Sequence, residues 1–294
     1  MQKRTLIIAG MHRSGTSLIT QWLTRCGMQL GEKLVEPGPG NPDGHFEDVE
    51  FLKMHEEILA NHNLPKTGLT DGRVDAFSVY EKEKIKTIIR VKQQLYDQWG
   101  WKDPRTCMFL NVYKELIPDA RYLVIMRDYR SVTSSLLKRE FKVIDRKYLG
   151  RKYLSRLVWL IFRRARRKNA FYRINAEAYL KVWINYTRDI LACIKKLDPD
   201  TFIVVNYAML NKEDIRVFSH LQNNWNFSLT YSRFNDVFKE NLIGHDLDID
   251  PYITNKSLIS HARQLQDELT AYINLTPYAQ PPRDLEEAEM ELQN

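Results

Sequence analysis

Two glycines, Gly10 and Gly15, have the spacing of a loop that holds phosphate groups. In the ATP-binding version of this loop, backbone N–H groups surround the phosphates and a lysine after the second glycine reaches the terminal ones. Here Thr16 stands in the position of that lysine, whereas Arg13 brings a guanidinium group into the loop. Because a guanidinium can grip an anion through two parallel hydrogen bonds, the loop is still predicted to bind phosphate or sulfate.

A second group of residues that could bind an anion follows the apolar run at 122–126. Arg127 comes directly after this run, and Ser135 lies on a segment that is predicted to be helical from about Tyr129. An arginine at a strand end and a serine on the next helix can converge on one phosphate, although both could also be ordinary surface residues. Two anion sites favour a nucleotide that is phosphorylated at two separate positions.

Alternating strands and helices are predicted to position both motifs. Three short apolar runs are typical of buried strands, at residues 6–9, 122–126 and 202–205. Apolar residues at helical spacing lie between them, at residues 18–23, 80–99 and 176–194. This order predicts an α/β fold, a P-loop-like three-layer sandwich in which helices flank a central, mainly parallel sheet. Ligands of such sheets bind beyond the carboxyl ends of the strands, where both motifs lie.

In these two motifs the chain resembles the sulfotransferases that use 3′-phosphoadenosine 5′-phosphosulfate (PAPS) as donor and release 3′-phosphoadenosine 5′-phosphate (PAP). The resemblance covers the loop at 10–18, the pair of Arg127 and Ser135, and the strands around them. It implies that Arg127 and Ser135 bind the 3′-phosphate and that the loop binds the 5′-phosphosulfate. The loop residues to which it gives this role are Arg13, Ser14, Gly15, Thr16 and Ser17.

The chain departs from the cytosolic animal branch of that family. The animal branch has lysine at the position of Arg13, tryptophan at the position of Leu18, and a late Arg-Lys-Gly segment that is not found here. The chain therefore looks more like the bacterial or carbohydrate-directed branches. Its adenine contacts are not assigned, with Tyr207 as a weak candidate whose alternative is a place in the core.

Sulfuryl transfer needs a base that takes the proton of an acceptor hydroxyl. Glu47 is the candidate we favour, because it follows a Gly/Pro-rich loop at 36–44 in a setting that resembles the position of the catalytic glutamate in several carbohydrate sulfotransferases. The alternative is that Glu47 and Asp48 cap the helix predicted at 49–59. His45 is the rival base, since an imidazole titrates near neutral pH.

Cationic groups are needed to stabilise the charge that develops on the sulfuryl group and the leaving phosphate. Arg13 is the first candidate for this role. Lys102, in the cluster at 101–105, is predicted to supply a second cation, with a structural salt bridge as the alternative. His12 either positions a substrate or packs under the loop. No metal is required by this scheme, and no spacing of histidines or cysteines indicates a metal site.

The net charge of +7 is unevenly distributed. Residues 138–173 contain 14 Lys or Arg and two acids, a balance of +12, so the rest of the chain carries −5. This basic insertion is predicted to form a lid or an acceptor wall, or to make peripheral membrane contact, and a solvated basic surface is the alternative. An anionic glycan or small molecule would suit it, and no nucleic-acid motif accompanies it.

The 294 residues, 44% of them hydrophobic, suffice for one large α/β domain. We expect that domain at residues 1–275, followed by an acidic, flexible tail at 276–294. No apolar run approaches the roughly 20 residues that cross a bilayer, and the start of the chain is unlike a signal peptide. The three cysteines are widely spaced and predict no disulfide framework. Together these features favour a cytoplasmic location, either in solution or at the inner face of a membrane.

The function predicted from these residues is sulfuryl transfer from PAPS to a hydroxyl of a carbohydrate or another small-molecule acceptor. One alternative is an ATP-dependent P-loop kinase. Thr16 in the position of the lysine, and a second anion site at Arg127 and Ser135, argue against it. The other is a noncatalytic protein that binds anions or membranes. The identity of the acceptor and the oligomeric state are not encoded in any motif of the chain.

Overall fold

The computed structural model describes residues 3–36, 38, 44–206, 209–238 and 246–273. Within them, one four-stranded sheet has the order β2-β1-β3-β4, and every pairing is parallel. The strands are β1 (Arg4–Ala9), β2 (Gln98–Lys102), β3 (Arg121–Met126) and β4 (Phe202–Asn206). The α/β fold with a parallel central sheet is therefore confirmed.

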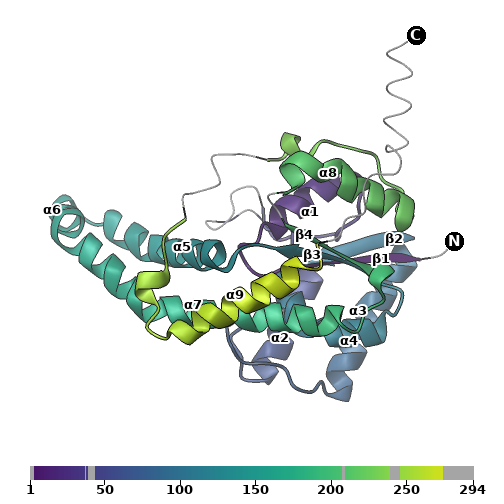
Figure 1. Cartoon of the computed structure of the whole chain (residues 1–294), viewed down its shortest axis with the longest axis horizontal. Coiled ribbons are helices and arrows are strands. Elements are labelled where there is room, and N and C mark those ends of the chain that lie inside the picture. Colours follow the sequence, from purple (N-terminus) through teal and green to yellow (C-terminus); the bar gives the residue numbers. More distant parts are fainter. Residues whose placement is uncertain (1–2, 37, 39–43, 207–208, 239–245, 274–294) are drawn as a thin grey trace, which may run out of the picture.

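Helices cover both faces of this sheet and make a three-layer arrangement (Figure 1). Alternate side chains of β1 enter different cores: Leu6 and Ile8 face one layer, and Ile7 and Ala9 face the other. The first layer contains α1 (Thr16–Arg25) and α8 (Leu210–Ser219). The second contains α2 (Val49–Asn61), α3 (Val79–Leu95), α4 (Leu110–Leu116), α7 (Arg164–Ile194) and α9 (Lys256–Thr270).

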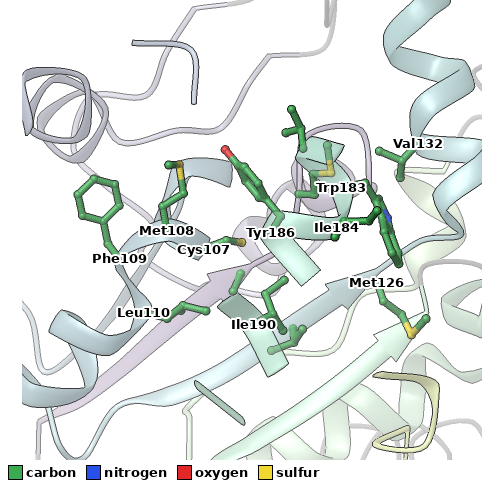
Figure 2. Packing of buried hydrophobic residues seen from close by; sticks show 14 of the residues in the cluster. Cys107, Met108, Phe109, Leu110, Met126, Val132, Trp183, Ile184, Tyr186 and Ile190 are labelled. Carbon is green, nitrogen blue, oxygen red and sulfur yellow. The ribbon is translucent and has the colours of Figure 1, made fainter. Parts of the chain in front are cut away.

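The long helix α7 fastens the second layer to the sheet. Its residues Trp183, Tyr186 and Ile190 lie among the buried side chains of the segment after β2 (Figure 2). Trp183 Nε1 also donates a hydrogen bond to the carbonyl of Arg127, 3.3 Å away. The helix thereby fixes the carboxyl end of β3, where a predicted anion motif begins.

A helical hairpin projects beyond the sheet (Figure 1). It consists of α5 (Tyr129–Leu149), α6 (Tyr153–Val158), the π-helical turn η2 (Trp159–Arg163) and the first part of α7. The start of α5 at Tyr129 agrees with the prediction. The basic residues 138–173 make up most of this hairpin. Their role as a lid or wall stays a prediction, as does the domain boundary at 275.

The segment at 96–102 differs from the prediction. Instead of a helix that continues to Trp99, α3 ends at Leu95 and a strand, β2, pairs with β1. Gly100 permits this pairing, because a Cβ atom at that position would lie 2.3 Å from the carbonyl oxygen of Leu6. Lys102 therefore ends an edge strand of the sheet.

Short helical turns complete the described fold: η1 (Pro104–Phe109), η3 (Pro199–Thr201), η5 (His220–Asn224), η6 (Phe234–Asp236) and η8 (Asp250–Tyr252). None of the helices in the described ranges has the length and apolar character needed to span a bilayer. The predicted tail at 276–294, Tyr207 and most of the Gly/Pro-rich loop lie outside the described residues.

Candidate active site

The loop between β1 and α1 is shaped by backbone geometry. Gly10 admits no side chain, because a Cβ atom there would lie 2.7 Å from both the carbonyl oxygen of Ile125 and the methyl group of Thr16. Arg13 and Gly15 have φ angles of 68° and 92°, so the chain turns sharply twice before the helix. Gly15 is the N-cap of α1. The first N–H groups of a helix have no acceptor within it and favour an anion.

Thr16 cannot take over the role of the missing lysine. The residue is 4% exposed, and its methyl group lies beside Gly10. Its carbonyl accepts a hydrogen bond of 2.7 Å from Thr20 Oγ1, an ordinary helical contact. Ser14 is also buried, at 2% exposure, and its N–H donates to the carbonyl of Met11. The side chains of both residues therefore support the loop from within.

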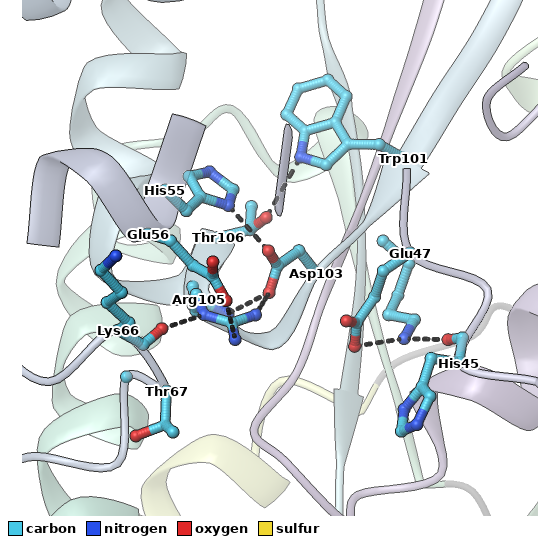
Figure 3. Close-up of polar contacts among 12 residues, drawn as sticks. His45, Glu47, His55, Glu56, Lys66, Thr67, Trp101, Asp103, Arg105 and Thr106 are labelled. Atoms are coloured by element: carbon cyan, nitrogen blue, oxygen red, sulfur yellow. Dashed lines mark hydrogen bonds and ion pairs between the residues drawn. The ribbon is translucent and has the colours of Figure 1, made fainter. Parts of the chain in front are cut away.

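A lysine reaches the loop from the neighbouring strand instead. Lys102 Nζ donates hydrogen bonds to Ser17 Oγ at 3.2 Å and to the carbonyl of His45 at 2.5 Å. It also forms an ion pair with Glu47 Oε1 at 3.1 Å (Figure 3). Ser17 Oγ in turn donates to the same His45 carbonyl, at 3.1 Å. Four of the predicted site residues thus meet at the end of the loop.

Burial makes this lysine electrostatically unusual. Its side chain is 1% exposed, and desolvation lowers its pKa, with Glu47 opposing that change. The alternative role proposed for Glu47, a cap on α2, belongs to Asp48 alone. Asp48 accepts hydrogen bonds from the N–H groups of Glu50 and Phe51, at 2.7 and 3.4 Å. Glu47 is therefore occupied with Lys102 and not with the helix terminus.

The two histidines near the loop differ in environment. The side chain of His12 is half-buried, and the centroid of its ring lies 6.0 Å from that of Tyr186. Desolvation and the nearby Arg105 lower the pKa of His12 to about 3, so it is neutral at physiological pH. Whether it positions a substrate or packs under the loop stays a prediction. Desolvation also lowers the pKa of His45, against the opposing effect of Glu47.

The second predicted anion motif lies at the other end of the same loop. Arg13 Nε donates a 2.9 Å hydrogen bond to Ser135 Oγ, and Arg127 Nη1 donates to the carbonyl of Arg13 at 3.1 Å. Arg127 Nη2 also lies 3.8 Å from Asp246 Oδ1. Burial, Arg139 and Arg127 together lower the pKa of Arg13 to about 10, which still leaves it charged at neutral pH. Both anion motifs therefore share one loop.

Arg139 is a further cation near this loop that the sequence analysis did not single out. Its charge acts on His12, Arg13 and His45 alike. It lies one helical turn after Ser135 on α5, so both face the same direction. That four-residue spacing is the signal in the sequence that could have identified it.

A buried polar network holds the strand end that carries Lys102 (Figure 3). Asp103 accepts from Arg105 Nη1 at 3.0 Å and lies 2.9 Å from His55 Nδ1. His55 Nε2 in turn lies 2.6 Å from the hydroxyl of Tyr113. Burial opposes the charge of Asp103, but Arg105 and His55 outweigh it and lower its pKa. The network therefore locks the turn after β2 and limits where Lys102 can point.

These contacts create a cationic loop with a carboxylate at one side. Such an arrangement can bind an anionic group and offer Glu47 or His45 as proton acceptor. The functional roles of the individual residues stay predictions. Among the described residues, no group of three or more His, Cys, Asp or Glu side chains is arranged to hold a metal ion.

Comparison with known proteins identifies what the chain is similar to. A profile described as the Sulfotransferase family matches residues 5–225. Sulfotransferase STF9 from Mycobacterium avium has a similar structure, with a TM-score of 0.53 and 15% identity over 91% of this chain and 77% of that chain. Sulfotransferase STF1 from Mycobacterium tuberculosis H37Rv gives a TM-score of 0.47 and 12% identity over 90% and 77% of the two chains. No curated protein sequence matches the chain.

Proposed function

The chain belongs to the sulfotransferase family, and we propose that it moves a sulfuryl group from PAPS to a hydroxyl of a carbohydrate or another small molecule. One observation supports PAPS as the donor. A single loop contacts Lys102 through Ser17 and contacts Ser135 through Arg13. A nucleotide that bears a 5′-phosphosulfate and a separate 3′-phosphate needs polar groups at two such places.

PAPS, when bound, supplies a sulfuryl group on a phosphate that leaves readily. The loop fits an anion of this kind, because its left-handed turns at Arg13 and Gly15 lead into the N-terminus of α1, where the first N–H groups favour an anion. Arg13, Ser14, Gly15, Thr16 and Ser17 are proposed to bind the 5′-phosphosulfate through this loop. Arg127 and Ser135 are proposed to bind the 3′-phosphate.

Arg13 and Lys102 are proposed to stabilise the negative charge that develops on the transferred group and the leaving phosphate. Their contacts favour this role, since both are largely withdrawn from water, where electrostatic interactions are stronger. No metal is part of the proposal.

Glu47 is proposed as the base that takes the proton of the acceptor hydroxyl. Its ion pair with Lys102 holds it beside the loop, whereas a capping residue would point toward α2. His45 stays the alternative base, since its lowered pKa leaves the imidazole neutral and able to accept a proton at pH 7.

A hydroxylated acceptor of negative charge, such as an anionic glycan or small molecule, is the class we favour. Arg139 and Lys138 lie on α5 just beyond Ser135, so the basic hairpin begins beside the donor site. We propose a cytoplasmic location, with which the three unpaired, buried cysteines are consistent.

Calorimetry with the full chain tests the donor. We expect PAP to bind at least about tenfold more tightly than AMP or ATP, because only PAP offers a charged group to both anion sites. Equal affinities for the three nucleotides would contradict the proposal. Transfer of label from PAPS to a panel of hydroxylated acceptors then tests the reaction, and magnesium-dependent ATP turnover would support the kinase alternative instead.

A further inference from the structure

The tip of the helical hairpin, residues 150–167, exposes apolar side chains among basic ones. Six apolar residues there are between 41% and 76% exposed: Tyr153, Leu154, Val158, Leu160, Ile161 and Phe162. Seven basic residues accompany them, and no acid occurs in this segment: Arg151, Lys152, Arg156, Arg163, Arg164, Arg166 and Arg167. Exposed apolar groups that cluster in this way mark an interaction surface.

The hairpin tip is held in place by its own contacts. Trp159 is 2% exposed, stacks on Tyr148 at 4.0 Å between ring centroids, and donates a 2.9 Å hydrogen bond to Asp145. Asp145 also accepts two hydrogen bonds from Arg164, at 2.8 and 2.7 Å. The π-helical turn that begins at Trp159 turns this one aromatic ring inward, and Ile161 and Phe162 stay outside.

The two acids of the basic insertion neutralise only two of its 14 basic residues. Asp145 is paired with Arg164, and Glu140 is paired with Arg139 at 2.7 Å. The hairpin therefore presents a net positive surface with apolar groups at its tip. Charge of one sign opposes association with a second copy of the same hairpin, whereas it favours an anionic partner.

We infer that the hairpin tip docks onto an anionic lipid bilayer. Apolar side chains such as Leu154 and Phe162 enter the headgroup region, and the surrounding arginines contact lipid phosphates. Segments that combine exposed apolar residues with Lys and Arg bind membrane surfaces in this manner. A soluble polyanion such as nucleic acid would use the basic residues but would leave the apolar ones in water.

This docking also limits the distance of the donor loop from the membrane. Ser135 lies on α5 and the tip follows the end of that helix, so the rise of α5 from Ser135 to Leu149 sets the distance from Ser135 to the start of the tip at about 20 Å. The docking surface is distinct from the anion-binding loop, and vesicle binding does not require sulfate transfer.

Cosedimentation of the full chain with lipid vesicles tests the inference. We expect binding to vesicles of phosphatidylcholine with phosphatidylglycerol and little binding to phosphatidylcholine alone. The double variant Leu154→Ser/Phe162→Ser should bind about tenfold more weakly, because it removes the inserted groups. The matched control is Val79→Ser/Tyr80→Ser on α3, whose residues are equally exposed but lie outside the hairpin, and it should bind as the wild type does.

A second variant tests the charge. Arg166→Glu/Arg167→Glu should also weaken binding about tenfold, and added salt should weaken wild-type binding. Circular dichroism of each variant establishes that the helices are intact. Unchanged vesicle binding by Leu154→Ser/Phe162→Ser would overturn the inference, and so would a wild-type dimer, detected by sedimentation velocity, that this variant dissociates.

Discussion

Lys102 Nζ lies 3.1 Å from Glu47 Oε1, and this ion pair joins the edge strand β2 to the segment that precedes α2. The lysine side chain is 1% exposed and the glutamate side chain 12% exposed. Burial alone would favour neutral Lys102, and Glu47 opposes that effect. The residue proposed as the base therefore favours the charged form of Lys102.

Replacing Glu47 separates catalysis from donor binding. Glu47→Gln keeps the shape of the side chain and removes its basicity, so we expect kcat for transfer from labelled PAPS to fall by about 10²- to 10⁴-fold. Binding of PAP, measured by calorimetry, should stay within about twofold, because Glu47 is not proposed to contact the nucleotide. Glu57→Gln, whose carboxylate pairs with Lys84 on α3 and not with Lys102, serves as the control and should keep full activity. Full activity of Glu47→Gln would leave His45 as the base.

The ion pair of Lys102 and Glu47 predicts that substitutions of the two residues have non-additive effects on the free energy of unfolding. Lys102→Met leaves a carboxylate with little water access, so we expect a loss of about 2–4 kcal/mol in the free energy of unfolding. Adding Glu47→Gln should restore part of this loss, because no unpaired charge is then buried. Urea denaturation of the two single variants and the double variant measures the coupling. Additive losses would show that the pair contributes nothing beyond its separate residues.

Much of the fold could be predicted because the relevant patterns are local. The buried strands at Leu6, Tyr122 and Phe202, the start of α5 at Tyr129 and the loop glycines are all encoded within short segments. The strand β2 was missed because its tryptophans and glycine follow a helix without a clear break, and only pairing with β1 distinguishes it from helix.

The candidate site depends on contacts that no local pattern encodes. Asp48 and Glu47 are adjacent acids, and only the structure shows that one caps α2 while the other pairs with Lys102. Arg139 was overlooked for a similar reason, since its approach to His45 depends on how α5 packs against the loop. Such three-dimensional relationships follow from tertiary packing rather than from spacing.

The proposed 3′-phosphate contact can be tested by nucleotide discrimination. Arg127→Met removes a charged donor, so we expect PAP to bind about 10- to 100-fold more weakly, with little change for AMP. Ser135→Ala removes a neutral partner of Arg13 and should cost about 3- to 10-fold. Arg130→Met is the control, because Arg130 pairs with Asp250 instead. Equal losses for PAP and AMP would argue against a 3′-phosphate at Arg127.

A half-buried carboxylate on α7 gives the protein a pH-dependent stability. Asp189 is 19% exposed and pairs with Arg73 at 2.8 Å. Despite this pair, burial raises the pKa of Asp189 to about 6, since Arg73 is itself 38% exposed and its charge is screened by water. The folded protein therefore holds a proton there at pH values where the unfolded chain has lost it.

Because the folded pKa of Asp189 lies above its unfolded value of about 3.9, its contribution to stability is fully present below about pH 4 and is lost as pH rises through about 6. Asp189→Asn removes this dependence. Relative to the variant, the wild type should lose about 2 kcal/mol of unfolding free energy between about pH 4 and pH 7. Urea titrations at both pH values measure the difference. Asp97→Asn is the control that should show little change over this range, since Lys3 lowers the pKa of Asp97 and its titration lies at lower pH. A constant difference between wild type and Asp189→Asn across this range would show that Asp189 titrates normally.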